Sequence, residues 1–276
     1  MVVHQNSVYR YAQNGKEHGR SMSKVIAVAN QKGGVGKTTS AVNIAASLGA
    51  KGKNTLLVDI DPQGNSTSGV GFDRRSLETT SYDILINGAK GQDAVRQTAF
   101  AGLSVIPSSA DLAAAEIELA DIPAREAVLK NALAPLRAAY DFILIDCPPS
   151  LGLLTLNALT AADSVLVPIQ CEYYALEGVG QLMNTVKLVR KKLNPALEVE
   201  GIVLTMFDAR TNLGAQVVTE VRNHFSREAF ATLIPRNVRL SEAPSHGKPI
   251  HLYDAKCSGA EAYFALADEL IERNRL

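Results

Sequence analysis

Tryptophan is absent from this chain of 276 residues, and Phe, Tyr and Trp together make up only 5% of it. The composition therefore argues against an aromatic stacking surface for single-stranded nucleic acid. The three cysteines, Cys147, Cys171 and Cys257, stand far apart and form no CxxC or Cys/His cluster. This spacing argues against a structural zinc site and a disulfide framework, and isolated cysteines in odd number are typical of a reducing cytosol.

The chain also lacks an excess of charge of either sign, because 28 Lys and Arg residues balance 28 Asp and Glu residues. A neutral total argues against the bulk positive field of a dedicated nucleic-acid coat protein, although it allows a local basic patch. Residues 1–21 contain no apolar core of a signal peptide, and no run of about 18 apolar residues follows them. We therefore predict no membrane-spanning segment and a cytoplasmic protein.

The first residues differ from the remainder of the chain. Residues 1–21 are polar, and Met22 stands just before the first apolar run. We predict a flexible tail over 1–21, which either precedes a natural start at Met22 or provides a basic arm for DNA. No low-complexity linker interrupts the rest, and 46% of all residues are hydrophobic. Residues 22–276 are thus predicted to form one domain with a substantial core.

Short apolar runs alternate with helical patterns, which predicts an α/β fold with a mostly parallel central sheet flanked by helices. The predicted strands cover residues 25–29, 55–59, 103–107, 142–146, 164–169, 201–206 and 231–235. The predicted helices cover residues 38–51, 109–119, 124–139, 152–161, 176–193, 213–225 and 259–273. Runs such as VIAVA and FILID are apolar throughout, as expected when helices cover both faces of the sheet.

A glycine-rich loop stands between the first predicted strand and the helix predicted over 38–51. Its residues are Lys32, Gly33, Gly34, Val35, Gly36, Lys37, Thr38 and Thr39. In such a loop backbone N–H groups converge on phosphate oxygens, and the helix N-terminus adds partial positive charge. We predict that Lys37 neutralises β- and γ-phosphate charge and that Thr38 binds Mg²⁺. The strict GxxxxGK[ST] pattern requires glycine where this chain has Gln31, and a second lysine, Lys32, opens the loop.

Three acidic residues end two other predicted strands. Asp59 ends the second predicted strand, Asp61 lies two residues beyond it, and Asp146 ends the strand FILID. Because the carboxyl ends of parallel strands meet at one crevice, these carboxylates are expected near the γ-phosphate and the metal. We predict that Asp61 orients or deprotonates the attacking water, and that Asp59 and Asp146 support the Mg²⁺.

Five segments together give a resemblance to a known family: KGGVGKTT, DIDPQGNST, DFILIDCPPS, TMFDARTNLG and IPRNVRLSEAPSHGKPI. They resemble the ParA/Soj chromosome-partitioning ATPases, within the larger deviant-Walker-A (MinD/ParA) group of P-loop NTPases. The resemblance covers the chain from Lys24 to its end. It implies an ATPase that converts ATP and water to ADP and phosphate, uses Mg²⁺, and serves a chromosome or a large plasmid.

The resemblance also implies roles for single residues. Lys32 matches the signature lysine, which in this family reaches the partner's ATP in a sandwich dimer. The matching loop residues, with Met206, Pro235 and Asn237, are expected to bind the nucleotide, the last three near the adenine. Arg210 and Arg239 match positions that bind DNA without sequence preference. A nucleoid-associated homodimer, released when a ParB-like centromere-binding partner stimulates hydrolysis, is therefore expected.

Other functions remain open in principle. A MinD-like membrane ATPase needs a basic amphipathic C-terminal helix, whereas Glu261, Asp268, Glu269 and Glu272 dominate here and predict a docked helix. A reductase of the nitrogenase iron-protein type needs paired cysteines to hold its cluster, and the three isolated cysteines here do not match that pattern. A plasmid-type ParA that represses its own gene needs an N-terminal helix-turn-helix, for which residues 1–21 are too few. A purely DNA-binding module would not need the hydrolytic residues.

Overall fold

The computed structural model describes residues 23–172 and 177–274, so the tail predicted over 1–21 lies outside the described residues. The strands are β1 Lys24–Val28, β2 Thr55–Asp59, β3 Arg96–Gln97, β4 Leu103–Ile106, β5 Phe142–Asp146, β6 Ser164–Gln170, β7 Glu198–Phe207 and β8 Ala229–Pro235. The α-helices are α1 Lys37–Ala50, α2 Asn65–Gly69, α3 Ser81–Leu85, α4 Gly91–Ala94, α5 Leu112–Glu118, α6 Val128–Leu133, α7 Leu153–Ala161, α8 Glu177–Lys192, α9 Asn212–His224, α10 Val238–Glu242, α11 Ile250–Tyr253 and α12 Ser258–Asn274.

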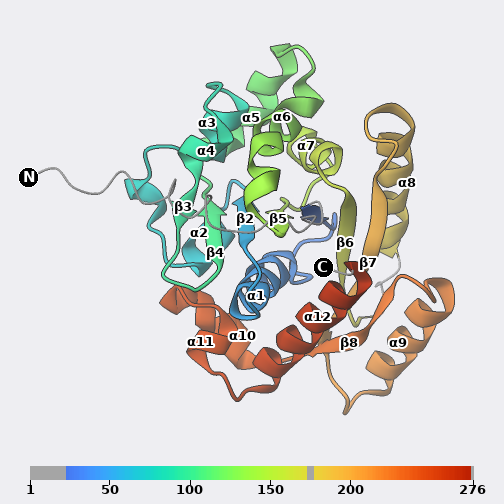
Figure 1. Cartoon of the computed structure of the whole chain (residues 1–276). Helices are drawn as coiled ribbons and strands as arrows, with labels where there is room; N and C mark the ends of the chain where they lie inside the picture. The colour runs from blue at the N-terminus through green and yellow to red at the C-terminus, as the bar shows by residue number, and fades with distance from the viewer. Residues whose placement is uncertain (1–22, 173–176, 275–276) are drawn as a thin grey trace, which may run out of the picture.

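The described strands form one eight-stranded sheet in the order β3-β4-β2-β5-β1-β6-β7-β8 (Figure 1). All neighbouring pairs are parallel except β3 and β4. The prediction of a mostly parallel α/β sheet is therefore confirmed. Seven of its strands coincide with predicted strands within a few residues at their ends, whereas the short antiparallel β3 was missed because two residues carry no periodic signal.

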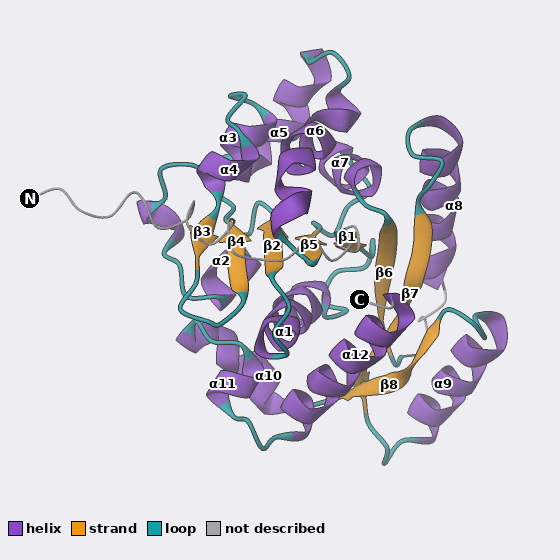
Figure 2. Ribbon diagram, in the orientation of Figure 1, coloured by secondary structure: helices purple, strands orange, loops and turns teal. Residues whose placement is uncertain are grey.

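Helices cover both faces of this sheet (Figure 2). Val25 and Ala27 of β1 pack into a core with α3, α5, α6, α7, α8 and α9. Ile26 and Val28, which point to the other face, pack with α1, α10 and α12. Because alternate side chains of one strand enter two different cores, the four buried residues of β1 after Lys24 are all apolar.

The structure differs from the sequence prediction in one long helix and several short ones. The single helix predicted over 124–139 is wrong: only α6 is α-helical, with 3₁₀ turns at Arg125–Ala127 and Ala134–Ala139. Pro135 explains the break, since it has no backbone N–H for the helical hydrogen bond. The helices α2, α3, α4, α10 and α11 have five residues or fewer, and such short elements are set by tertiary contacts rather than by periodicity.

The C-terminal helix α12 is docked on the body of the protein, as its acidic composition predicts. Tyr263, Leu266 and Leu270 are buried in the core that α12 shares with α1. Glu269 accepts hydrogen bonds from the backbone N–H groups of Ala231 and Thr232 in β8. The apolar face of this helix is therefore already covered. Within the described ranges, no helix has the length and apolar character needed to cross a bilayer.

Candidate nucleotide-binding site

The glycine-rich loop connects β1 to α1 at the carboxyl end of the sheet. Gly34 and Gly36 have φ angles of 74° and 87°, in the left-handed region that favours glycine. The hydroxyl of Thr205, from the end of β7, donates a hydrogen bond of 2.8 Å to the Val35 carbonyl. The loop is thus fixed both by its own backbone and by a strand distant in sequence.

Lys37 is the first residue of α1, and its side chain is buried. Its ammonium donates to the Lys32 carbonyl at 3.0 Å. Burial lowers the pKa of Lys37, while the neighbouring charges of Asp146 and Asp61 oppose this change. The first turn of α1 contains no acidic residue, so the positive end of the helix is open to an anion.

Asp59 and Asp146 are register partners at the carboxyl ends of β2 and β5, and both are fully buried. One oxygen of Asp59 accepts hydrogen bonds from the backbone N–H and the hydroxyl of Thr67, at 2.8 and 2.7 Å. Its other oxygen accepts from the backbone N–H of Asp61 at 3.1 Å. The Ser66 hydroxyl donates to Asp146 Oδ2 at 2.7 Å. The two carboxylates therefore fix the start of α2.

Two carboxylates in one buried place perturb each other. Burial and the charge of Asp59 raise the pKa of Asp146 to about 8, although the Ser66 and Thr38 hydroxyls act in the opposite direction. Burial raises the pKa of Asp59 to about 6, against the hydrogen bonds from Thr67 and Asp61. Ionised carboxylates are disfavoured here unless a cation comes close.

A magnesium ion fits this arrangement. Asp146 Oδ1 is buried and accepts no hydrogen bond of standard geometry within the described residues. Across those residues, no group of three or more His, Cys, Asp and Glu side chains could hold a metal by itself. Mg²⁺ at nucleotide sites typically takes one or two carboxylates, waters and substrate phosphates. The Thr38 hydroxyl and Asp146 are the residues that would hold it, with Asp59 behind them.

Asp61 lies after β2, closer to the surface than Asp59. One of its carboxylate oxygens accepts from the Gln63 backbone N–H at 2.9 Å. Its carbonyl accepts hydrogen bonds from the Gly64 N–H at 2.8 Å and from the Ser108 hydroxyl at 2.6 Å. Asp61 is therefore held in a tight turn beside the glycine-rich loop.

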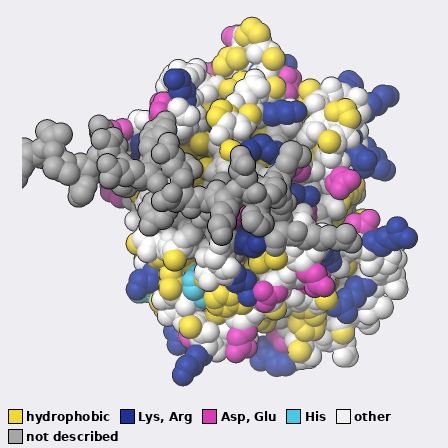
Figure 3. Space-filling model, viewed as in Figure 1, with side chains coloured by type: hydrophobic (Ala, Val, Ile, Leu, Met, Phe, Trp, Pro, Cys, Tyr) yellow, Lys and Arg dark blue, Asp and Glu magenta, His cyan; other side chains and the backbone are white. Residues whose placement is uncertain are grey.

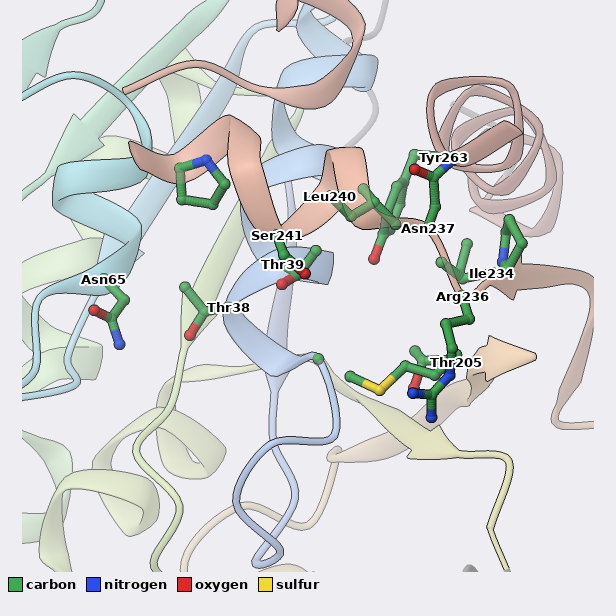
Figure 4. Close-up of a pocket in the computed structure, with 14 residues that line it drawn as sticks. Thr38, Thr39, Asn65, Thr205, Ile234, Arg236, Asn237, Leu240, Ser241 and Tyr263 are labelled. Atoms are coloured by element: carbon green, nitrogen blue, oxygen red, sulfur yellow. The ribbon is translucent and has the colours of Figure 1, made fainter. Parts of the chain in front are cut away.

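Two adjoining hollows open onto this loop. The inner hollow, of about 300 Å³, is lined by Gly33, Gly34, Gly36, Lys37, Thr38, Thr39, Asp61, Gln63, Asn65, Pro149 and Met206. The outer hollow, of about 390 Å³, is lined by Gly36, Thr38, Thr39, Asn65, Thr205, Met206, Ile234, Pro235, Arg236, Asn237, Leu240, Ser241, Pro244 and Tyr263. Figure 4 shows the outer hollow, with Thr38 and Thr39 from α1 between Asn65 on one side and Asn237 and Tyr263 on the other. Together they form one cleft, in which the charged Lys37 and Asp61 line only the inner hollow and Tyr263 lines only the outer one.

Most residues predicted for the site are brought together in this cleft. Met206, Pro235 and Asn237 line the outer hollow, where a base would lie beyond the phosphates. Met206 has a φ angle of 52°, which is unusual for a residue with a side chain and falls where the pairing of β7 with β8 shifts register, between Leu204 and Phe207. Asp59 and Asp146 lie beneath the cleft and do not line it. The Lys32 side chain is outside both linings.

Several lining residues were missed by the sequence prediction. Gln63 and Asn65 stand in the segment DIDPQGNST, which contributed to the resemblance but in which only Asp59 and Asp61 were given roles. Arg236 lies between two predicted residues. No local sequence pattern marks Tyr263 as a lining residue, because Tyr263 is far from the loop in sequence. Only the fold brings its hydroxyl to the Ser40 hydroxyl, at 3.1 Å.

The two arginines predicted to bind DNA are exposed but engaged. The Arg210 side chain is 87% exposed and contacts both carboxylate oxygens of Asp208, at 2.9 and 2.7 Å. This pair holds the pKa of Asp208 well below its usual range. Arg239 is 52% exposed and lies 2.8 Å from Glu242 and 3.6 Å from Asp254. Both arginines follow strands whose carboxyl ends also form the nucleotide cleft. On the face in Figure 3, basic and acidic side chains are interspersed.

Comparison with known proteins places these features in a family. A family model described as an AAA domain matches residues 23–199. The chain is 59% identical to the sporulation initiation inhibitor protein Soj of Bacillus subtilis over 249 residues, covering 90% of this chain and 98% of that protein. It is 54% identical to the chromosome partitioning protein ParA of Myxococcus xanthus over 260 residues, covering 94% and 92%.

Solved structures show the same fold with nucleotides. A Mycobacterium smegmatis structure, named cobyrinic acid a,c-diamide synthase and holding ADP and magnesium, is 40% identical, with a TM-score of 0.79 and coverage of 90% and 93%. The septum site-determining protein MinD of Pyrococcus horikoshii, with Mg-ADP, is 27% identical, with a TM-score of 0.74 and coverage of 90% and 96%. From the glycine-rich loop, the paired carboxylates and these relatives, it follows that the chain belongs to the ParA/Soj family of chromosome-partitioning P-loop ATPases.

Proposed function

We propose that this protein binds and hydrolyses Mg-ATP in the cleft formed by the two hollows, and that ATP controls a DNA-binding dimer. The observation that carries the proposal is the convergence of Lys37, Thr38 and Asp61 on one inner hollow, beside Asp146, whose buried Oδ1 accepts no hydrogen bond of standard geometry from the described residues. The nucleotides and magnesium named for the solved relatives support the same ligands here.

Each residue has a distinct task in this proposal. The backbone of Gly33, Gly34 and Gly36 surrounds the phosphates, and Lys37 neutralises their charge. Magnesium, when bound, offsets the negative charge that develops on the phosphates. Asp61 positions or deprotonates the attacking water from its tight turn, since phosphoryl transfer depends mainly on positioning and charge stabilisation. Asp59 supports the metal site indirectly, by fixing Thr67.

Lys32 acts in the partner subunit. Its ammonium does not line the inner hollow of its own chain. In an ATP-bound sandwich dimer it reaches the partner's phosphates and supplies charge in trans, as an arginine finger does. Dimerisation then depends on ATP, and hydrolysis ends it.

The dimer binds double-stranded DNA without sequence preference through Arg210 and Arg239. Both side chains are exposed, and DNA phosphates replace Asp208 and Glu242 as their partners. Neutralising the DNA backbone needs only a few basic groups, and dimerisation doubles their number. We further propose a cytoplasmic, nucleoid-associated protein with one ATPase domain over residues 22–276, which a ParB-like partner releases from DNA by stimulating hydrolysis.

Two other functions are less well supported. A MinD-like membrane ATPase would need a free amphipathic C-terminal helix, whereas α12 is packed on α1 and β8. Amide synthesis, as in the name of the Mycobacterium smegmatis structure, concerns a relative at 40% identity, whereas Soj is 59% identical over nearly its full length.

The test is retention on non-specific DNA with ATP, with ADP and without nucleotide, each over a salt series. We expect retention with ATP alone and a steep loss at higher salt. Lys32→Ala should bind ATP normally but fail to dimerise and to bind DNA. Equal retention in all three nucleotide states would contradict the proposal, and normal dimerisation of Lys32→Ala would remove its role in trans.

A further inference from the structure

Hydrogen bonds fix the backbone of Lys32 in the loop, whereas its side chain is partly exposed. The Lys32 N–H donates to the Asn30 side chain at 3.0 Å, and the Lys32 carbonyl accepts from the Lys37 ammonium at 3.0 Å. Asn30 is itself held by the Pro168 carbonyl at 2.7 Å. Because both the N–H and the carbonyl of Lys32 are anchored, its side chain can turn toward another subunit without a change in the loop backbone.

The side chain of Lys32 points to Glu172, just beyond β6. The Lys32 ammonium lies 3.8 Å from one carboxylate oxygen of Glu172, and the Arg236 guanidinium lies 3.9 Å from the other. The Gln170 side chain also donates to this carboxylate. Within the described ranges, neither Lys32 nor Arg236 has a carboxylate other than Glu172 within 4.0 Å.

These contacts join three segments that are far apart in sequence. Lys32 belongs to the glycine-rich loop, Glu172 follows β6, and Arg236 follows β8 and lines the outer hollow (Figure 4). We propose that Glu172 is a resting counter-ion, which holds Lys32 against its own subunit and thereby opposes ATP-dependent dimerisation. The inference rests on the proposed function, because it deepens the role of Lys32 in the dimer.

The expected effect is modest in size and definite in sign. Lys32 and Glu172 have side chains that are 40% and 46% exposed, so water and salt screen their attraction. The contact must break in each subunit when Lys32 turns to the partner's ATP. Removing the charge of Glu172 therefore strengthens dimerisation by about two- to tenfold, since two exposed ion pairs no longer have to be broken. The gain should shrink at high salt.

The experiment measures the dimer dissociation constant of the full chain with a non-hydrolysable ATP analogue and Mg²⁺, by sedimentation equilibrium at low and high salt. Glu172→Gln keeps the side-chain shape and removes its charge. Glu198→Gln is the matched control, because this substitution makes the same change in net charge and Glu198 is exposed at the opposite end of the sheet. Glu172→Asp, which keeps the charge on a shorter side chain, should lie between wild type and Glu172→Gln.

Tighter dimerisation of Glu172→Gln at low salt, absent from the Glu198 control, supports the inference. A dimer that is equally strong or weaker overturns it, and a weaker one would mean that Glu172 makes a favourable contact in the dimer. If the wild type itself does not dimerise with the ATP analogue, the proposed function fails and the inference with it. The two failures are thus distinguishable.

Discussion

Replacing Asp146 by Asn should make the nucleotide-free protein more stable at neutral and alkaline pH, even though it should impair ATP hydrolysis. Asp146 is fully buried beside Asp59, and its pKa is raised to about 8 by burial first and by the Asp59 charge second. The unfolded chain keeps the ordinary value of 3.8. The folded chain therefore holds this proton more tightly than the unfolded chain.

The sign of the pH dependence follows directly. Between about pH 4 and about pH 8 unfolding releases a proton, so stability falls as the pH rises through this window. One pKa unit corresponds to about 1.4 kcal/mol, which gives a loss of roughly 4 kcal/mol by about pH 7. Asn cannot ionise and avoids this loss, but its amide N–H group in a buried place costs about 1–3 kcal/mol if unpartnered. The net gain of Asp146→Asn is about 1–3 kcal/mol.

The assay is urea unfolding at about pH 5 and about pH 8, followed by circular dichroism, with nucleotide and Mg²⁺ removed. Wild type should lose stability between these values, while Asp146→Asn should lose less. Mg-ATP should then stabilise wild type more than the variant, because a cation favours the ionised carboxylate.

Asp121→Asn is a suitable control, since Asp121 is exposed in a surface turn. It should leave both the stability and its pH dependence unchanged. If Asp146→Asn is less stable than wild type at about pH 8, or keeps the same dependence of stability on pH, the buried Asp146 does not destabilise the folded protein as inferred.

Three further predictions concern activity. Lys37→Ala should abolish ATP binding, and DNA binding with it; intact ATP-dependent DNA retention would rule out the proposed phosphate site. Asp61→Ala should bind ATP and DNA but hydrolyse ATP at least about a hundredfold more slowly, leaving a trapped dimer on DNA, whereas normal phosphate release would remove Asp61 from catalysis. Arg210→Ala and Arg239→Ala should each lower the slope of log affinity against log salt by about 1 to 2 in the dimer while sparing ATPase activity, and an unchanged slope would exclude that arginine as a phosphate contact.

The sequence predicted those features that depend on neighbouring residues. The glycines of KGGVGKTT specify a loop with positive φ angles, and the apolar runs before it and after it specify a strand and a helix. Asp59 and Asp146 each end an apolar strand, so parallel pairing was enough to predict that both lie at one edge of the sheet; that they are direct neighbours follows from the strand order. Pro135 could have warned against a long helix over 124–139, but the surrounding alanines and leucines outweighed it.

What the sequence did not determine is which charges are free. Arg210 and Arg239 look alike as isolated basic residues, yet Asp208, Glu242 and Asp254 compensate them in the fold. Asp59 and Asp61 are two positions apart, but only Asp61 reaches the cleft.

The sequence by itself determined the fold class, the phosphate loop and the acidic strand ends, because backbone conformation and hydrophobic burial depend on local patterns. Tertiary structure alone decided that Tyr263 lines the cleft, that Asp146 and Asp59 are buried side by side, and that Lys32 faces Glu172. Each of these depends on segments that meet only when the sheet forms. The strength of a charge depends on what lies within a few ångströms of it, and that environment is assembled from the whole chain.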